Sequence, residues 1–251
     1  MSTIFDLGGR RAIVTGANTG IGQAIALSLA AAGADIAAVG RTPAEETVEK
    51  VRALGRKAEI VSADLSSIEP VQRVVDETIA KLGGLDILIN NAGIIRRADS
   101  VDFTEEDWDA VIDTNLKSTF FLAQAAGRHM LRQGSGKIVN IASLLSFQGG
   151  IRVPSYTASK SGVAGLTKLL ANEWAAKGVN VNAIAPGYIA TNNTAALQAD
   201  ETRNRQIQER IPAGRWGDAS DIGGAAVFLA SPAANYIHGH VLAVDGGWLA
   251  R

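Results

Sequence analysis

Short apolar runs alternate with longer helical patterns along almost the whole of this 251-residue chain. A strand followed by a helix, repeated several times, predicts a parallel sheet with helices on both faces. Because no linker rich in proline, glycine or serine divides the chain, we predict one α/β domain, residues 1–251, with a doubly wound parallel sheet of about seven strands. The predicted strands are 11–15, 35–40, 58–62, 86–89, 137–141, 180–184 and 240–244.

The helices predicted between and after these strands are 21–32, 44–54, 69–81, 105–131, 155–177 and 220–230. One irregular region, 188–215, follows the sixth strand and is polar before it becomes helical in pattern. An insertion at this point of an open sheet lies over the carboxyl ends of the strands, where ligands bind. We therefore interpret residues 188–215 as a substrate lid.

Composition excludes several classes of function. A formal net charge of −1 gives no basic face for nucleic acid, and the absence of cysteine rules out disulfides and thiolate metal sites. The three histidines show no metal-ligand spacing, so no metal is expected. Residues 1–11 lack the apolar core of a signal peptide, and no run approaches the ~18 apolar residues of a membrane span. We therefore expect a soluble, cytoplasmic protein without a nucleic-acid or membrane partner.

A glycine-rich turn, Thr15-Gly16-Ala17-Asn18-Thr19-Gly20-Ile21-Gly22, stands between the first predicted strand and the first predicted helix. Glycines at such a place allow the backbone to approach a pyrophosphate, toward which the free N–H groups of the helix N-terminus point. Three residues separate the first two glycines, unlike the usual G-x-G-x-x-G, and a plain tight turn is the alternative. The position of the turn favours a dinucleotide site formed by Gly16, Asn18, Thr19, Gly20, Ile21 and Gly22.

Three further segments follow strands of the same predicted sheet, so they are expected at the same edge. In Asp64-Leu65, the carboxylate of Asp64 could accept a hydrogen bond from an adenine amine. The small residues of Asn91-Ala92-Gly93 let the backbone run close to a ligand. Each segment has an alternative explanation as a helix cap, a turn or a strand terminator. The third segment contributes Pro186, Gly187, Ile189 and Thr191, of which Thr191 could reach a carboxamide.

Tyr156 and Lys160, in Ser155-Tyr156-Thr157-Ala158-Ser159-Lys160, are four residues apart within a predicted helix. This spacing places two side chains on one face of a helix, so a phenol and an ammonium can share one pocket. A neighbouring ammonium favours the phenolate, and we expect it to bring the pKa of Tyr156 below its usual value of ~10. Ser143, which follows an apolar run, is the third member of a candidate proton-transfer group.

Together these motifs resemble those of the short-chain dehydrogenase/reductase family, over nearly the whole chain. The resemblance rests on 15–22, 90–93, Asn115, Ser143, Tyr156-x-x-x-Lys160 and Pro186-Gly187. It implies a Rossmann-type fold, an NAD(P)-dependent oxidoreductase acting on CH–OH groups, and a homotetramer built partly from the two longest helices.

The resemblance also implies four catalytic roles. Tyr156 exchanges a proton with the substrate oxygen, Lys160 holds the ribose hydroxyls, and Ser143 stabilises charge on the reacting oxygen. Asn115 anchors a water that links Lys160 to solvent. An ordinary loop serine and a polar residue on a wet helix face are the alternative interpretations of Ser143 and Asn115.

Arginines give the best indication of the substrate. A guanidinium binds a carboxylate through a bidentate fork; Arg97 and Arg152 are the preferred pair, with Gln148 and Asn193 as partners for hydroxyl groups, and solvated surface arginines are the alternative. Within the family, segments 91–97, 146–156, 190–194 and 244–251 are most similar to dehydrogenases of deoxy sugar acids. The expected reaction is hydride transfer between a nicotinamide and a keto or hydroxy group of a small sugar acid of the 2-keto-3-deoxygluconate type, in uronate catabolism.

The choice between NAD(H) and NADP(H) is open from the sequence. An acidic residue at the end of the second strand favours NAD through the ribose 2′-hydroxyl, but this chain has Gly40-Arg41-Thr42 there. Arg41 offers a cation to a 2′-phosphate, so use of both cofactors is expected. Alternative functions are reduction of 3-oxoacyl carriers or of unsaturated-uronate products and, from another class, dinucleotide sensing without catalysis.

Overall fold

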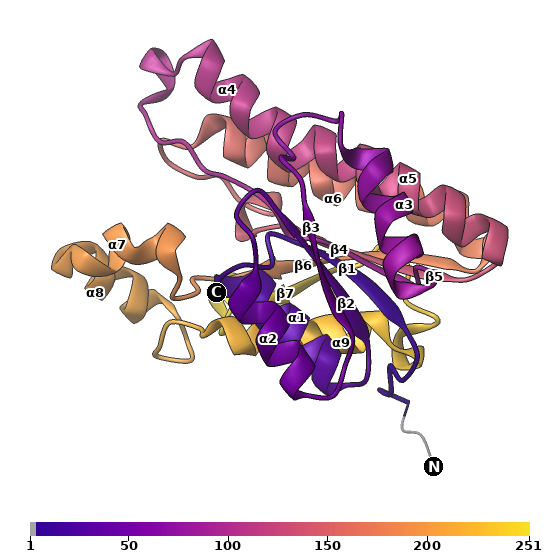
Figure 1. Ribbon diagram of the computed structural model, residues 1–251. Coiled ribbons are helices and arrows are strands. Elements are labelled where there is room, and N and C mark those ends of the chain that lie inside the picture. Colours follow the sequence, from indigo (N-terminus) through magenta and orange to yellow (C-terminus); the bar gives the residue numbers. More distant parts are fainter. Residues whose placement is uncertain (1–3) are drawn as a thin grey trace.

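The computed structural model describes residues 4–251, with the side chain of Asn193 excepted. Its strands are β1 (Arg11–Thr15), β2 (Asp35–Gly40), β3 (Ala58–Ser62), β4 (Ile87–Asn90), β5 (Gly136–Ile141), β6 (Val179–Pro186) and β7 (Val241–Val244). They form one seven-stranded parallel sheet in the order β3-β2-β1-β4-β5-β6-β7 (Figure 1). The predicted single-domain, doubly wound α/β fold is therefore confirmed.

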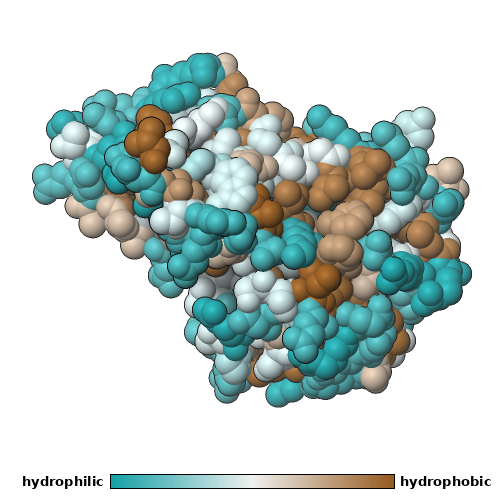
Figure 2. Space-filling model, turned by 90° about the horizontal axis from the view of Figure 1, so that it is seen from above, coloured by the Kyte–Doolittle hydropathy of each residue, from teal (hydrophilic) through white to brown (hydrophobic). Residues whose placement is uncertain are grey.

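Helices cover both faces of the sheet (Figure 1). On one face pack α1 (Gly20–Ala31), α2 (Glu45–Ala53) and α9 (Ala219–Ala230); on the other pack α3 (Val71–Leu82), α5 (Ser118–Gln133) and α6 (Pro154–Trp174). α4 (Glu105–Ile112) lies against α6, while α7 (Ala195–Ala199) and α8 (Glu201–Arg210) stand apart from these layers. Seen from the side of α4–α6, apolar side chains gather between polar ones (Figure 2). Within residues 4–251, no helix is long and apolar enough to cross a membrane.

The alternation of side chains along each strand explains the two-layered core. Successive residues of a strand point to opposite faces of the sheet, so Ala12 and Val14 of β1 lie in the apolar cluster with α1 and α9. Ile13 lies in the cluster with α3 and α5 on the other face. Because helices cover both faces of this parallel sheet, all three residues of the strand are apolar.

The direction in which the chain builds the sheet reverses at β1, which lies between β2 and β4. α1 follows β1 on one face, whereas α5 follows β4 on the other. Ligands of open α/β sheets bind in the crevice outside the carboxyl ends of the strands at such a point. The crevice therefore lies between the glycine turn after β1 and the segment after β4.

The long helix predicted at 105–131 is interrupted in the structure. After α4, one turn of π-helix, Asp113–Lys117, precedes α5. This turn includes Asn115, whose buried side chain bonds to the backbone of Ile94, and such bulges are frequent at functional sites. The other predicted strands and helices differ from the observed ones only at their ends.

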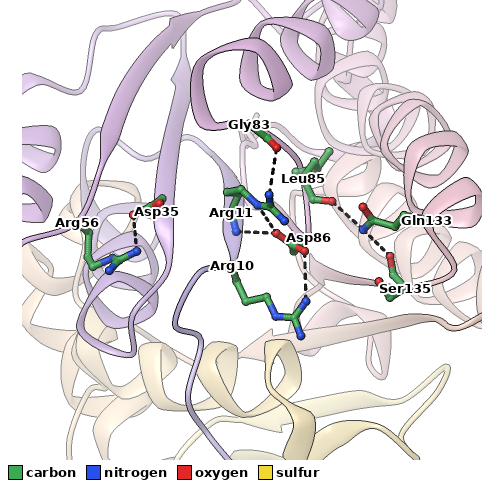
Figure 3. A network of polar contacts seen from close by, with 9 residues as sticks. All are labelled: Arg10, Arg11, Asp35, Arg56, Gly83, Leu85, Asp86, Gln133 and Ser135. Atoms are coloured by element: carbon green, nitrogen blue, oxygen red, sulfur yellow. Dashed lines mark hydrogen bonds and ion pairs between the residues drawn. The ribbon is translucent and has the colours of Figure 1, made fainter. Parts of the chain in front are cut away.

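At the opposite, amino-terminal edge of the sheet, the buried Asp86 carboxylate joins two arginines (Figure 3). Its oxygens accept from the backbone N and the Nε of Arg11 at 2.9 and 2.6 Å, and one lies 3.3 Å from a guanidinium nitrogen of Arg10. Burial alone would raise the pKa of Asp86, but the hydrogen bonds of Arg11 and the charges of Arg11 and Arg10 outweigh it and lower the pKa. Removing one partner of such a pair leaves the other charge uncompensated.

Replacing Asp86 by Asn is expected to lower the free energy of unfolding by about 2 kcal/mol at pH 7, because Arg11 loses a charged acceptor. The contribution of the carboxylate is present above its unfolded-state pKa of ~3.9 and is lost as the pH falls through the lower pKa of the folded state. The difference between Asp86→Asn and wild type should therefore shrink below about pH 4. Urea unfolding measures it, with the exposed Asp102→Asn as control; equal effects of the two substitutions at pH 7 would contradict the prediction.

Candidate active site

The glycine turn brings the backbone of β1 and α1 close together and close to the segment after β4. Gly16 and Gly20 adopt φ angles of +64° and +57°, a region that favours glycine. A Cβ on Gly22 would lie 2.1 Å from the carbonyl oxygen of Gly16, and a Cβ on Gly16 would lie 2.9 Å from Nδ2 of Asn91. Because only glycine fits here, the N-terminus of α1 faces the crevice without an intervening side chain.

Thr15, the last residue of β1, ties the glycine turn to the end of β4. Its hydroxyl accepts from the backbone N atoms of Asn91 and Ala92, both at 2.9 Å, and donates to the carbonyl of Ile89 at 3.3 Å. Nδ2 of Asn91 donates in turn to the carbonyl oxygen of Thr15 at 2.8 Å. These bonds hold the two walls of the crevice in a fixed relation.

A cavity of about 340 Å³ fills the crevice and suits a dinucleotide. Backbone N–H groups at the start of a helix bind phosphates, and the cradle they form here is one that a Cβ on Gly22 would fill. The residues present therefore fit the pyrophosphate of a nicotinamide cofactor. Most of the predicted cofactor residues line this cavity: Gly16, Asn18, Thr19, Gly20, Ile21, Gly22, Asn91, Ala92, Gly93, Tyr156, Lys160 and Thr191.

The other predicted cofactor residues are not among those that line this cavity. Arg41 and Asp64 are exposed, with a guanidinium nitrogen 3.9 Å from a carboxylate oxygen. The carboxylate of Asp64 also accepts from the backbone N of Ser66 at 2.9 Å, as a turn-capping side chain does. Of the remaining four residues, Leu65 and Ile189 lie in the apolar core. Pro186 and Gly187 line a neighbouring cavity.

Asn115 fastens the segment after β4 to the helices above it. Its Oδ1 accepts from the backbone N of Ile94 at 2.8 Å, and its Nδ2 donates to the carbonyl of Ile94 at 2.9 Å. Nδ2 also lies 3.4 Å from Oγ of Ser159 on α6, whose hydroxyl donates to the carbonyl of Tyr156. Asn115 is only 1% exposed, so the alternative of a polar residue on a wet helix face is wrong.

Tyr156 lies where the cofactor cavity meets a second, larger cavity, since it lines both. Nζ of Lys160 lies 5.6 Å from the centroid of the Tyr156 ring and donates to the carbonyl of Ile141 at 2.6 Å. The side chain of Ser143 lies close enough to Tyr156 to act on the pKa of its phenol, and both residues line the second cavity. The three side chains predicted to transfer the proton are thus brought together.

Burial dominates the electrostatics of this group. It raises the pKa of Tyr156, against the nearby Ser143 hydroxyl and the positive charge of Arg97, which lower it. Burial also lowers the pKa of Lys160 to about 8. The expectation that Lys160 brings the pKa of Tyr156 below its usual value is therefore wrong for this arrangement, in which the ammonium bonds to the carbonyl of Ile141.

The second cavity, of about 510 Å³, extends from Tyr156 to α8. Its lining contains Arg97, Arg203 and Arg210 and, within the described part of the chain, no aspartate or glutamate. The guanidinium carbon of Arg210 lies 4.0 Å from the centroid of the Trp248 ring, a cation–π contact. The space beside the reacting phenol is therefore positively charged.

Two of the predicted substrate residues, Arg97 and Gln148, line this second cavity. Arg152 does not: its exposed guanidinium pairs with Asp99 at 3.0 Å, and its backbone has a φ of +63°. The expected pairing of Arg97 with Arg152 is therefore corrected, because neighbouring loops supply Arg152 with an acid of its own. The side chain of Asn193 lies outside the described part of the structure.

Arg203 and Arg210 are functional candidates that the sequence analysis missed. They stand seven residues apart and so share one face of α8, within the predicted lid; this spacing is the signal that could have found them. Trp248 is buried as expected for a packing residue, with its ring centroid 4.7 Å from that of Tyr188. It also lines the second cavity and donates from Nε1 to Oε1 of Gln148 at 3.3 Å.

A phosphate cradle at the switch point of a doubly wound sheet, beside a half-buried tyrosine and a buried lysine, is typical of dinucleotide-dependent oxidoreductases. A family model described as enoyl-(acyl carrier protein) reductase matches residues 16–249. The 2-dehydro-3-deoxy-D-gluconate 5-dehydrogenase of Escherichia coli (strain K12) is 58% identical over 248 residues, which cover 98% of each chain. The chain belongs to the short-chain dehydrogenase/reductase family, whose members are oxidoreductases that use NAD(P)(H).

Solved structures agree with this assignment. A protein of Agrobacterium tumefaciens, assigned as a 2-deoxy-D-gluconate 3-dehydrogenase and crystallised with NADP, is 62% identical, with a TM-score of 0.94 and coverage of 99% of this chain and 100% of that one. A 3-oxoacyl-[acyl-carrier-protein] reductase of Staphylococcus aureus (strain Mu50) is less similar, 42% identical over 241 residues, 95% of this chain and 97% of that one. The similarity is thus greater to sugar-acid dehydrogenases than to this acyl-carrier reductase.

Gly22→Ala is expected to lower the free energy of unfolding by about 2 kcal/mol or more, because the new Cβ must displace the backbone of Gly16. The same displacement should weaken NADPH binding at least about tenfold. Gly165→Ala on α6 is the matched control, since its Cβ would meet nothing within 4 Å, and it should raise stability by up to about 1 kcal/mol. Urea unfolding and fluorescence titration with NADPH measure both effects; a Gly22→Ala protein as stable and as tight-binding as Gly165→Ala would refute the prediction.

Proposed function

We propose that the protein transfers a hydride between a nicotinamide cofactor and a keto or hydroxy group of a deoxy sugar acid of the 2-keto-3-deoxygluconate type, in uronate catabolism. The observation that carries this proposal is the cavity beside Tyr156, lined by three arginines and, among the described residues, no acid. Guanidinium groups bind carboxylates through paired hydrogen bonds, so this cavity suits an acidic substrate. The 58% identity to an enzyme that carries the name of such a reaction supports the same substrate class.

The proposed roles follow from the positions of the side chains. When bound, the nicotinamide supplies or accepts the hydride. Tyr156 exchanges a proton with the substrate oxygen; its phenol is protonated near neutral pH and lies where the two cavities meet, so it can donate a proton to the substrate during reduction. Ser143 hydrogen-bonds the reacting oxygen, and Lys160, beside the tyrosine ring, holds the ribose hydroxyls.

Residues 188–215 act as a substrate lid in this proposal. α8 contributes Arg203 and Arg210 to the second cavity, and the guanidinium of Arg251 donates to the carbonyls of Glu209 and Arg210 at the end of this helix. The C-terminus therefore helps to hold the arginines of the lid. Asn115 holds the segment after β4 in place, and its link through water to Lys160 stays a prediction.

We also propose NADP(H) as the better cofactor, with NAD(H) as the second. Arg41 follows the carboxyl end of β2 and its side chain is 80% exposed, so it is free to turn toward a 2′-phosphate. Its contact with Asp64 is at 3.9 Å between exposed groups, and such surface pairs contribute little. The Agrobacterium tumefaciens structure with NADP supports this choice.

A homotetramer and a cytoplasmic location complete the proposal, on the strength of the family resemblance. Apolar side chains are exposed on the helices that the resemblance assigns to subunit contacts, among them Trp108 on α4 and Leu169 on α6. The same side of the molecule shows apolar surface in Figure 2. Exposed apolar surface of this kind is typical of protein interfaces.

The purified protein is expected to turn over 2-keto-3-deoxygluconate with NADP or NAD, followed by absorbance of the reduced nicotinamide. Tyr156→Phe should lower kcat/KM by about 10²–10⁴, because the proton donor is lost, while NADPH binding is retained. Tyr236→Phe is the matched control, since Tyr236 is 99% exposed, and it should keep wild-type activity. Absence of turnover with either cofactor, in a protein that binds NADPH, would refute the proposed substrate assignment.

Arg41→Ser should raise KM for NADP at least about tenfold, because a charged hydrogen bond to the 2′-phosphate is lost. KM for NAD should change little, since NAD carries no 2′-phosphate. Arg132→Ser removes one exposed arginine elsewhere and controls for net charge. Steady-state kinetics with both cofactors measure the ratio, and a ratio that Arg41→Ser leaves unchanged would exclude Arg41 as the 2′-phosphate ligand.

A further inference from the structure

A further cavity, with a polar lining, lies at the amino-terminal edge of the sheet, away from the two cavities of the active site. Its volume is about 350 Å³, and it lies between the starts of β4, β5 and β6 and the segment that joins α9 to β7. At ~3.3 Å per residue, the strands place it roughly 15–25 Å from the carboxyl edge that holds the active site. Figure 3 shows the Arg10 side of this cavity. Its polar lining includes Arg10, Lys137, Asn180, Asn235 and His238.

Asn180 links Lys137 to the chain around His238 within this cavity. Oδ1 of Asn180 accepts from Nζ of Lys137 at 3.0 Å, so the nitrogen of this amide is the donor end. That nitrogen donates to backbone carbonyls and lies 3.3 Å from Nε2 of His238. The amide of Asn180 is therefore satisfied within the protein, and its oxygen holds Lys137 at the cavity.

Two cations face the same cavity without a matching number of acids. Nζ of Lys137 bonds to two neutral amide oxygens, at 3.0 and 2.7 Å, and to no carboxylate of residues 4–251. Arg10 lies 3.3 Å from Asp86, but that carboxylate already holds Arg11 at 2.6 Å. Burial and the charge of Arg10 lower the pKa of Lys137 to about 8. The cavity therefore presents more donors and more positive charge than its own acceptors balance.

A simpler explanation is that these groups only cap the carbonyl ends of nearby helices. Helix C-termini favour cations, and residues at the ends of α6 and α9 line the cavity. Capping explains Lys137, but it does not explain a second cation, Arg10, that lines the same cavity and repels it. A negatively charged acceptor satisfies both cations.

We infer that this cavity binds a small oxyanion, a phosphate or a carboxylate, held by Lys137 and Arg10. The lysine and the arginine supply charged hydrogen bonds. The other charged groups facing the site are Asp86 and, bonded to it, Arg11. The site is separate from the active-site cavities, and a ligand bound there stabilises the folded state by mass action.

Calorimetric titration with inorganic phosphate tests this inference. The full chain is saturated with NADPH, which closes the pyrophosphate cradle, and chloride keeps the ionic strength constant. Wild type should bind phosphate, Lys137→Gln should bind it at least about tenfold more weakly, and the exposed Lys177→Gln should resemble wild type. Phosphate held by the arginines of the active site would survive Lys137→Gln, and acetate titrated in parallel separates a carboxylate site from a phosphate site.

Two results would support the site. Binding should be lost in both Lys137→Gln and Arg10→Gln. Wild-type binding should also weaken as the pH rises through about 8, where Lys137 loses its proton. Circular dichroism and NADPH binding check that each variant is folded. If Lys137→Gln does not fold, phosphate binding by Arg10→Gln tests the inference instead. Equal binding in wild type and in the folded variants would overturn the inference. So would the absence of phosphate and acetate binding by wild type in the millimolar range.

Discussion

The hydroxyl of Thr15 is the contact on which the active site depends. It accepts hydrogen bonds from two backbone N–H groups in the segment after β4 and donates one to the carbonyl of Ile89 in β4, so it joins the carboxyl ends of β1 and β4. The glycine turn is packed against Asn91 and leaves no room for a Cβ at Gly22. From there Asn115 continues the connection to α6, which carries Tyr156 and Lys160. Phosphate cradle and proton donor are thus positioned by one continuous network.

Burial and charge act in opposite directions at the two ends of the active site. Around Tyr156 and Lys160, burial favours the neutral forms of both groups, as the raised pKa of one and the lowered pKa of the other indicate. In the adjoining cavity, three arginines face space that none of the described acids shares. A substrate with a carboxylate at one end and a carbonyl at the other matches both parts of the site. The arginines suit the carboxylate, and the group around Tyr156 suits the carbonyl.

The sequence predicted the features that depend on residues close together in the chain. Short runs of apolar residues mark the strands, which is why β1, β2 and β3 were predicted to the residue, and the glycines of the turn follow from sterics within eight residues. Contacts between distant loops were out of reach: Arg152 meets Asp99 across 53 positions of the chain, and Arg210 is placed by Trp248. The lowered pKa expected for Tyr156 was wrong because helical spacing shows which groups are neighbours, but not how deeply they are buried.

The most direct measurement compares kcat/KM for 2-keto-3-deoxygluconate with that for its uncharged amide, in wild type and in Arg210→Gln. If the arginines beside Tyr156 recognise the substrate carboxylate, wild type should prefer the acid by at least about 100-fold, since charged hydrogen bonds contribute about 1.5–3 kcal/mol each. The preference should fall in Arg210→Gln. Equal rates for acid and amide in wild type, or a preference that Arg210→Gln leaves unchanged, would contradict this recognition.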